Sequence, residues 1–155
     1  MIQPIVGTNS YVSLEAADAL ASERLFTRTW HTATEERRAR AIITATALLD
    51  RMQWRGRPLA PTQRLAWPRV ANGCPEGYPL TAHIPAPIAA ATVELAIHLL
   101  STGELPSGPA IMQRMLGDSM AMYFAHVADE LPKHVRRLVE PFLEASSANV
   151  AVVRF

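Results

Sequence analysis

At residues 49–58 the sequence reads Leu49-Asp50-Arg51-Met52-Gln53-Trp54-Arg55-Gly56-Arg57-Pro58, and a helical pattern here gives way to a proline-broken loop. The loop continues to Gln63-Arg64-Leu65-Ala66-Trp67-Pro68-Arg69. Together the two pieces contain two tryptophans and five arginines, with Asp50 as their only acid. Such a segment could either contact nucleic acid or wedge a loop against a helical core.

Upstream of this stretch the sequence predicts two helices. Ser13 is a good N-cap, and apolar residues recur behind it at helical spacing, so we expect a helix from about Ser13 to Phe26. Thr32 with Glu35 three residues later forms a capping-box pattern. A second helix is therefore expected from about Thr34 to Met52, and its apolar stripe consists of Ile42, Ala45, Leu49 and Met52.

Downstream, prolines and glycines between residues 56 and 87 exclude a long helix. A third helix is expected to begin at Pro85 or Pro87 and to stop at Gly103. Its buried stripe consists of Ile88, Ala91, Thr92, Leu95 and Leu99. A fourth helix should start at Pro132 and kink or end at Pro141.

Two features complete the expected fold. Gly117-Asp118 lies between two short apolar runs and could turn a hairpin, although the surrounding residues also favour helix. Beyond a polar hinge, the β-prone end of the chain includes Val150, Val152, Val153, Arg154 and Phe155. We therefore predict a mainly α protein: a helical domain of about four helices with a short β-hairpin (residues 1–145), and an extended C-terminal tail (residues 146–155).

Composition limits the classes of function. The chain has 155 residues, a net charge of +1 and only 19% charged residues, so any attraction to nucleic acid or to a membrane surface must be local. The low charge content also suggests that neighbouring subunits cover some of the surface. Cys74 is the only cysteine, and no apolar run reaches membrane-spanning length. These features predict a cytoplasmic protein without disulfides.

The sequence carries no recognised motif of an enzyme or of a metal site. No two of the five histidines lie three or four residues apart, and no nucleophile elbow, phosphate-binding glycine loop or HExxH helix is present. Glu94 and His98 form one helical i,i+4 pair, which predicts a surface contact. Cys74 and His83 have no catalytic signature around them. We expect no enzymatic activity, no cofactor and no metal.

The tryptophan- and arginine-rich segment allows two interpretations. In the first, Trp54 and Trp67 stack on bases while arginines neutralise phosphates; these arginines are Arg51, Arg55, Arg57, Arg64 and Arg69. In the second, Trp54 closes the end of a helix over the core, Trp67 pins the loop back, and arginine stems cover apolar surface. The second is favoured, because isolated tryptophans more often anchor a core.

Three ordered pieces of the sequence carry a family resemblance. They are Gly7-Thr8-Asn9-Ser10-Tyr11-Val12-Ser13-Leu14-Glu15-Ala16-Ala17-Asp18, the Leu49 to Arg57 segment, and Gln63 to Arg69; the Ile84-Pro85 start of the third helix also fits. The chain resembles the group labelled DnaT-like single-stranded DNA-binding proteins. Sequences in that group are similar to the head–tail adaptor, or head-completion, proteins of tailed bacteriophages.

The resemblance implies a structural protein of the virion neck. Its partners would be the phage portal protein and a tail-side neck protein, and it would form a homo-oligomeric ring, usually a dodecamer, around passing DNA. Its location would be the virion, and the host cytoplasm during assembly, without membrane contact. The C-terminal tail would dock onto portal subunits, for which strand addition is suitable. The alternative is a single-stranded DNA-binding module that uses the tryptophan- and arginine-rich segment.

Overall fold

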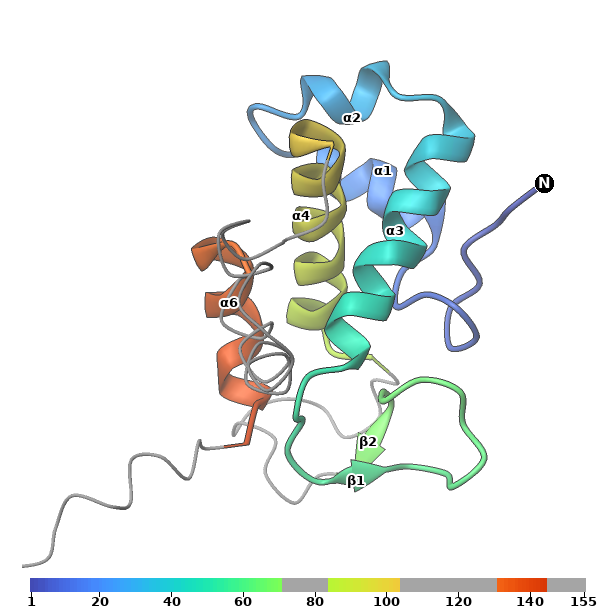
Figure 1. The fold of residues 1–155 in the computed structure, drawn as a ribbon, viewed down its shortest axis with the longest axis vertical. Helices are drawn as coiled ribbons and strands as arrows, with labels where there is room; N and C mark the ends of the chain where they lie inside the picture. Colours follow the sequence, from blue (N-terminus) through green and yellow to red (C-terminus); the bar gives the residue numbers. More distant parts are fainter. Residues whose placement is uncertain (71–83, 104–130, 145–155) are drawn as a thin grey trace, which may run out of the picture.

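The computed structural model describes residues 1–70, 84–103 and 131–144 of the chain (Figure 1). In these parts it contains five α-helices, one 3-10 helix and two short strands. In chain order they are α1 (Leu14–Ser22), α2 (Arg28–Thr32), α3 (Glu35–Asp50), β1 (Arg57–Pro58), β2 (Arg69–Val70), α4 (Ala86–Thr102), α6 (Lys133–Val139) and the 3-10 helix η3 (Glu140–Phe142). The predicted mainly α class with a short hairpin is confirmed, although the hairpin described, β1–β2, is not the one expected at Gly117-Asp118.

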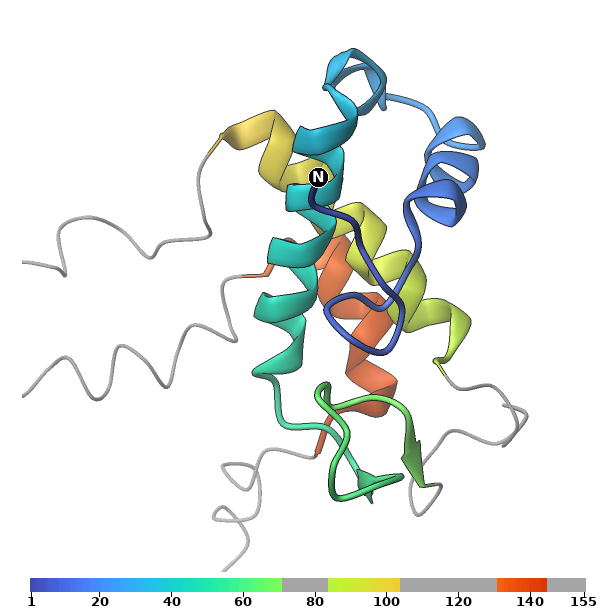
Figure 2. The same ribbon diagram turned by 90° about the vertical axis from the view of Figure 1, so that its right-hand side faces the viewer.

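The core lies between α3, α4 and α6. Helices α3 and α4 lie side by side, and α6 packs on another flank of α4 (Figures 1 and 2). Their inward faces hold the largest fully buried aliphatic side chains, which are Ile42, Leu49, Ile88, Leu95, Val93, Val135 and Val139. Burying each such side chain stabilises the fold by roughly 1.5–3 kcal/mol. The apolar stripes expected on the second and third helices therefore do face the core.

Helix ends follow local capping rules. The Ser13 hydroxyl accepts a hydrogen bond from the Ala16 N–H at 3.2 Å, and Gly103 ends α4 with a φ of 69°. Helix α3 is capped by Thr34, whose hydroxyl accepts from the Arg37 N–H at 3.3 Å. The predicted capping box at Thr32 is therefore wrong, because Thr32 belongs to α2.

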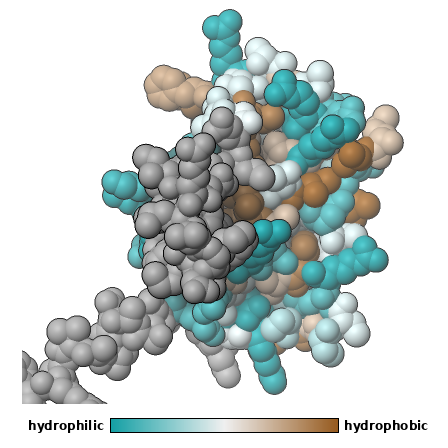
Figure 3. Space-filling view, in the orientation of Figure 1, coloured by the Kyte–Doolittle hydropathy of each residue, from teal (hydrophilic) through white to brown (hydrophobic). Residues whose placement is uncertain are grey.

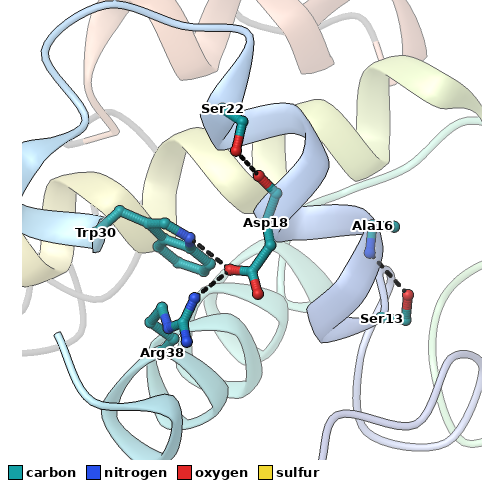
Figure 4. Close-up of polar contacts among 6 residues, drawn as sticks. All are labelled: Ser13, Ala16, Asp18, Ser22, Trp30 and Arg38. Carbon is teal, nitrogen blue, oxygen red and sulfur yellow. Dashed lines mark hydrogen bonds and ion pairs between the residues drawn. The ribbon is translucent and has the colours of Figure 1, made fainter. Parts of the chain in front are cut away.

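The first helix is shorter than expected. It ends at Ser22, with Glu23 as its C-cap, and Phe26 cannot belong to it because a right-handed helix does not contain a φ of 63°. The chain then turns into α2, a short helix that periodicity does not reveal. Asp18 joins these elements: its carboxylate accepts from the indole N–H of Trp30 at 2.8 Å and pairs with Arg38 at 2.5 Å (Figure 4).

The hairpin forms at one end of the helical body. Strands β1 and β2 pair antiparallel, with Arg57 opposite Val70 and Pro58 opposite Arg69. The hairpin predicted at Gly117-Asp118 lies outside the described residues, as does the C-terminal tail of residues 146–155. The division between domain and tail therefore stays a prediction.

Candidate nucleic-acid interface

The arginine loop, residues 51–70, begins where α3 ends and contains both strands of the hairpin (Figure 1). It is joined to η3 and to the residues just after it by main-chain hydrogen bonds. The Arg55 N–H donates to the Phe142 carbonyl at 2.9 Å, and the Glu144 N–H donates to the Gln53 carbonyl at 2.9 Å. The loop therefore has a fixed position on the helical body, although its regular secondary structure is limited to two-residue strands.

Asp50, the only acid of the stretch, is directed toward the base of the loop. Its carboxylate accepts hydrogen bonds from the hydroxyl of buried Tyr11 and from the Ala66 N–H, the latter at 2.6 Å. Burial raises the pKa of the Tyr11 phenol, and the hydrogen bond and negative charge of Asp50 raise it further. Asp50 thus joins the loop to the N-terminal segment through these two hydrogen bonds.

Two further side chains hold the loop together from inside. The Gln63 amide donates to the carbonyls of Leu65 and Pro68 at 2.7 and 2.9 Å. The Arg69 guanidinium donates to several main-chain carbonyls, which are those of Arg55, Ala66, Trp54 and Gly56 at distances of 2.5 to 3.3 Å. Arg69 is therefore a structural pin of the loop, and its donors are directed into the loop.

The two tryptophans of the loop are buried. Trp54 is 4% exposed and Trp67 is 3% exposed. Their rings meet edge to face with centroids 5.6 Å apart, and Trp67 meets Phe142 in the same way at 5.6 Å. The expectation that both rings anchor the core is confirmed. A role for them as DNA contacts stays a prediction. The burial of both rings does not favour it, because a base could not stack on them.

The remaining four arginines of the loop are on its surface. Arg51, Arg55, Arg57 and Arg64 are exposed, and none of them forms an ion pair with any residue of the described ranges. Only Arg55 makes a side-chain hydrogen bond there, from its Nε to the Leu143 carbonyl at 2.6 Å. The structure thus places four of the five candidate arginines where a phosphate can reach them.

The surroundings of the loop are not uniformly basic. Hydrophilic and hydrophobic residues are interleaved over the coloured part of the face in Figure 3, and with a net charge of +1 any basic site has to be local. Helix α6 adds cations that the candidate set missed, namely exposed Lys133, Arg136 and Arg137. The run Lys133-His134-Val135-Arg136-Arg137 could have revealed them from the sequence, but the prediction gave only the bounds of this helix.

Other chemistry is not indicated in the described ranges. No three His, Cys, Asp or Glu side chains there converge as a metal site. None of the helices there has both the length and the apolar character needed to cross a bilayer. Glu94, expected to make a surface contact with His98, instead pairs with Arg24 and lies 3.6 Å from the His134 Nε2. Cys74 and His83 lie outside these ranges.

Residues 3–155 match the sequence family described as "Putative DnaT-like ssDNA binding protein". The chain belongs to this family. No curated protein sequence and no solved structure matches the chain. The family is the group whose motifs the sequence resembles, so that part of the resemblance is confirmed.

The family description corrects the expected role in a phage neck. It refers to single-stranded DNA binding and not to a portal, connector, tail or ring. The assignment as a virion structural protein and head–tail adaptor is therefore wrong by this comparison. The residues assigned to portal docking, from Val150 to Phe155, lie outside the described ranges.

Proposed function

We propose that this protein binds single-stranded DNA through the exposed arginines of the arginine loop. The proposal rests on where the charged side chains of this loop lie. Four arginines face solvent, namely Arg51, Arg55, Arg57 and Arg64, whereas the single acid, Asp50, is hydrogen-bonded at the base of the loop. A phosphate approaching the surface therefore meets cations without a competing carboxylate from the same segment. The family description supports this choice of ligand.

The loop is also built to keep its shape on binding. Asp50, Gln63 and Arg69 fix its main chain, and the paired indoles fill the space beneath it. Binding to an ordered loop avoids the entropic cost of ordering it. Because guanidinium–phosphate contacts carry no sequence information, binding should not depend on base sequence. The proposal is one of binding and includes no catalytic step.

The experiment is fluorescence anisotropy with a labelled oligo-dT at low salt. The double variant Arg57→Gln/Arg64→Gln removes two loop cations, whereas Arg37→Gln/Arg40→Gln removes two exposed cations of α3 and leaves the loop intact. The loop variant should bind about tenfold more weakly, because each phosphate contact contributes to affinity. The α3 variant should stay within about twofold of the parent protein.

Two outcomes would contradict the proposal. One is an absence of measurable oligo-dT binding by the parent protein at low salt. The other is an equal loss in both double variants, which would show that binding follows overall charge and not the loop. Arg69 is unsuitable for this comparison, because its replacement also removes the hydrogen bonds that hold the loop.

A further inference from the structure

The turn between α1 and α2, residues 23–27, presents two apolar side chains to solvent. Leu25 is 84% exposed and Phe26 is 95% exposed. Phe26 also has a φ of 63°, a left-handed conformation that bulky residues rarely adopt and that costs free energy. A fully exposed aromatic ring in a strained conformation adds nothing to the core, so a role in the fold does not explain it.

The turn is held firmly on both sides of the exposed residues. Arg24 forms an ion pair with Glu94 of α4, and its N–H donates to the Ala21 carbonyl at 3.2 Å. The hydroxyl of buried Thr27 donates to the Arg24 carbonyl at 3.3 Å, and Trp30 follows with no exposed surface. The main chain is thus anchored while the Phe26 ring points away from the body.

Cationic side chains connect this turn with the arginine loop. Arg24 and Arg28 flank the exposed pair, and Arg28 forms no ion pair within the described residues. Helix α6 lies on the flank of α4 between the turn and the hairpin (Figure 1). At one end of α6, His134 is 3.6 Å from the carboxylate that pairs with Arg24; beyond its other end, just after η3, the Arg55 Nε donates to the Leu143 carbonyl.

Lys133 and Arg137 are exposed side chains of α6 and, at helical i,i+4 spacing, lie on the same face of the helix. Acids also lie near this surface. Glu94 is already paired with Arg24, whereas exposed Glu23, Glu140 and Glu144 lie toward the two ends. A route along α6 therefore offers phosphate contacts from the arginine loop to the turn, and it ends at an accessible aromatic ring.

We propose that Phe26 stacks on a base of single-stranded DNA whose backbone runs from the arginine loop along α6. The inference rests on the proposed function and adds to it the residue that distinguishes single strands from duplexes. Unpaired bases expose their faces, whereas duplex bases are covered by their neighbours, and stacking on an aromatic ring tolerates any base. The buried indoles of Trp54 and Trp67 cannot serve this purpose in the conformation described.

The decisive variant is Phe26→Leu, because leucine keeps an apolar side chain at the same backbone position and removes the aromatic face. Affinity for a labelled 20-nucleotide oligo-dT should fall about tenfold, within the range of one lost base–aromatic stack. Phe26→Tyr should bind within about twofold of the parent protein. The matched control Leu25→Ala alters the neighbouring exposed residue and should also stay within about twofold.

An abasic oligonucleotide of equal length separates stacking from backbone contacts. Phe26→Leu should bind this probe as the parent does, since no base is present to lose. A second readout is Phe26→Trp, whose fluorescence should be quenched by oligo-dT. The native Trp30, Trp54 and Trp67 are all buried, so they should contribute little to the change. Circular dichroism of each variant verifies that the fold is retained.

The outcomes distinguish this inference from the proposed function. If the parent protein binds oligo-dT, the loop variant loses affinity and Phe26→Leu does not, the stacking inference is wrong and the proposed function stands. If the parent does not bind at all, the proposed function itself fails. Equal losses in Phe26→Leu and Leu25→Ala, or a loss on the abasic probe, would show that the turn affects binding without stacking on a base, and would overturn the inference.

Discussion

The arginine loop and the α1–α2 turn combine the same residue types in opposite ways. In the loop the aromatic rings of Trp54 and Trp67 are buried, and the exposed arginines surround them. In the turn the arginines are adjacent to Phe26, whose ring is almost fully exposed. Aromatic residues near arginines in a sequence can therefore have either of two roles. They can pack beneath a basic surface, or they can be exposed as part of that surface.

Hydrogen bonding explains the difference. The loop has internal partners for its main chain, supplied by Asp50, Gln63 and Arg69, and its closure draws the indoles inward. In the turn, Thr27 is buried, whereas Phe26 has a positive φ and its ring is almost fully exposed. We infer that the loop contributes charge at a fixed position and that the turn contributes an accessible ring.

The largest expected effect tests the supporting role of the indoles. Trp67→Ala should lower the free energy of unfolding by about 3–5 kcal/mol, because it leaves a cavity next to Trp54 and Phe142. Chemical denaturation measures the change. Trp67→Phe is the matched control and should cost less, since it keeps a ring and removes an N–H that has no partner in the described residues. An unchanged midpoint in Trp67→Ala would show that the loop does not depend on its buried rings.

A smaller effect concerns the hydrogen bond from Tyr11 to Asp50 beneath the loop. Tyr11→Phe removes the phenol that donates to Asp50 and should cost about 1.5–3 kcal/mol near neutral pH, as for hydrogen bonds to charged groups. The pKa of Tyr11 is raised in the folded protein, so its stabilising effect is complete below the unfolded pKa of about 10 and is lost as pH rises above that value.

Urea unfolding measured from pH 8 to 11 tests both the stability lost in Tyr11→Phe and the dependence of that loss on pH. The parent protein should lose stability above about pH 10 more steeply than Tyr11→Phe does. If the stability of the two proteins changed with pH in the same way, the fold would not raise the pKa of Tyr11, and its phenol would not remain protonated in the folded state at high pH.

The smallest expected effect has the opposite sign and concerns the turn. Phe26→Gly should raise the free energy of unfolding by about 0.5–1 kcal/mol, because glycine adopts a positive φ without strain. Leu25→Gly is the control and should not stabilise, since Leu25 does not have a positive φ. Equal changes in melting temperature for the two variants would argue against strain at Phe26.

Much of the helical framework could be predicted from the sequence. Apolar periodicity and capping residues located α1, α3, α4 and α6, because these signals are local. Helix α2 was missed, since five residues are too few to show a period. The early end of α1 was missed because no glycine marks the positive φ at Phe26. The Thr32 cap failed because Thr34, two residues later, fits the start of α3 equally well in sequence.

The candidate site was predictable only in part. Four exposed arginines could be named from composition, but the roles of Asp50 and Arg69 depend on partners distant in sequence. Tyr11 meets Asp50 across 39 residues, and Arg69 reaches carbonyls more than a dozen residues upstream. The exposure of Phe26 likewise depends on tertiary packing. Pairing at such distances is set by how the helices pack and not by a local pattern.

The most direct measurement of the central claim is the salt dependence of oligo-dT binding. If exposed loop arginines contact phosphates, the logarithm of the association constant should fall linearly with the logarithm of salt concentration, by about 0.7 per neutralised phosphate. Arg57→Gln/Arg64→Gln should therefore make the slope shallower by about 1.4, whereas Arg37→Gln/Arg40→Gln should leave it unchanged. A slope that is the same in the loop variant and the parent protein would contradict the account.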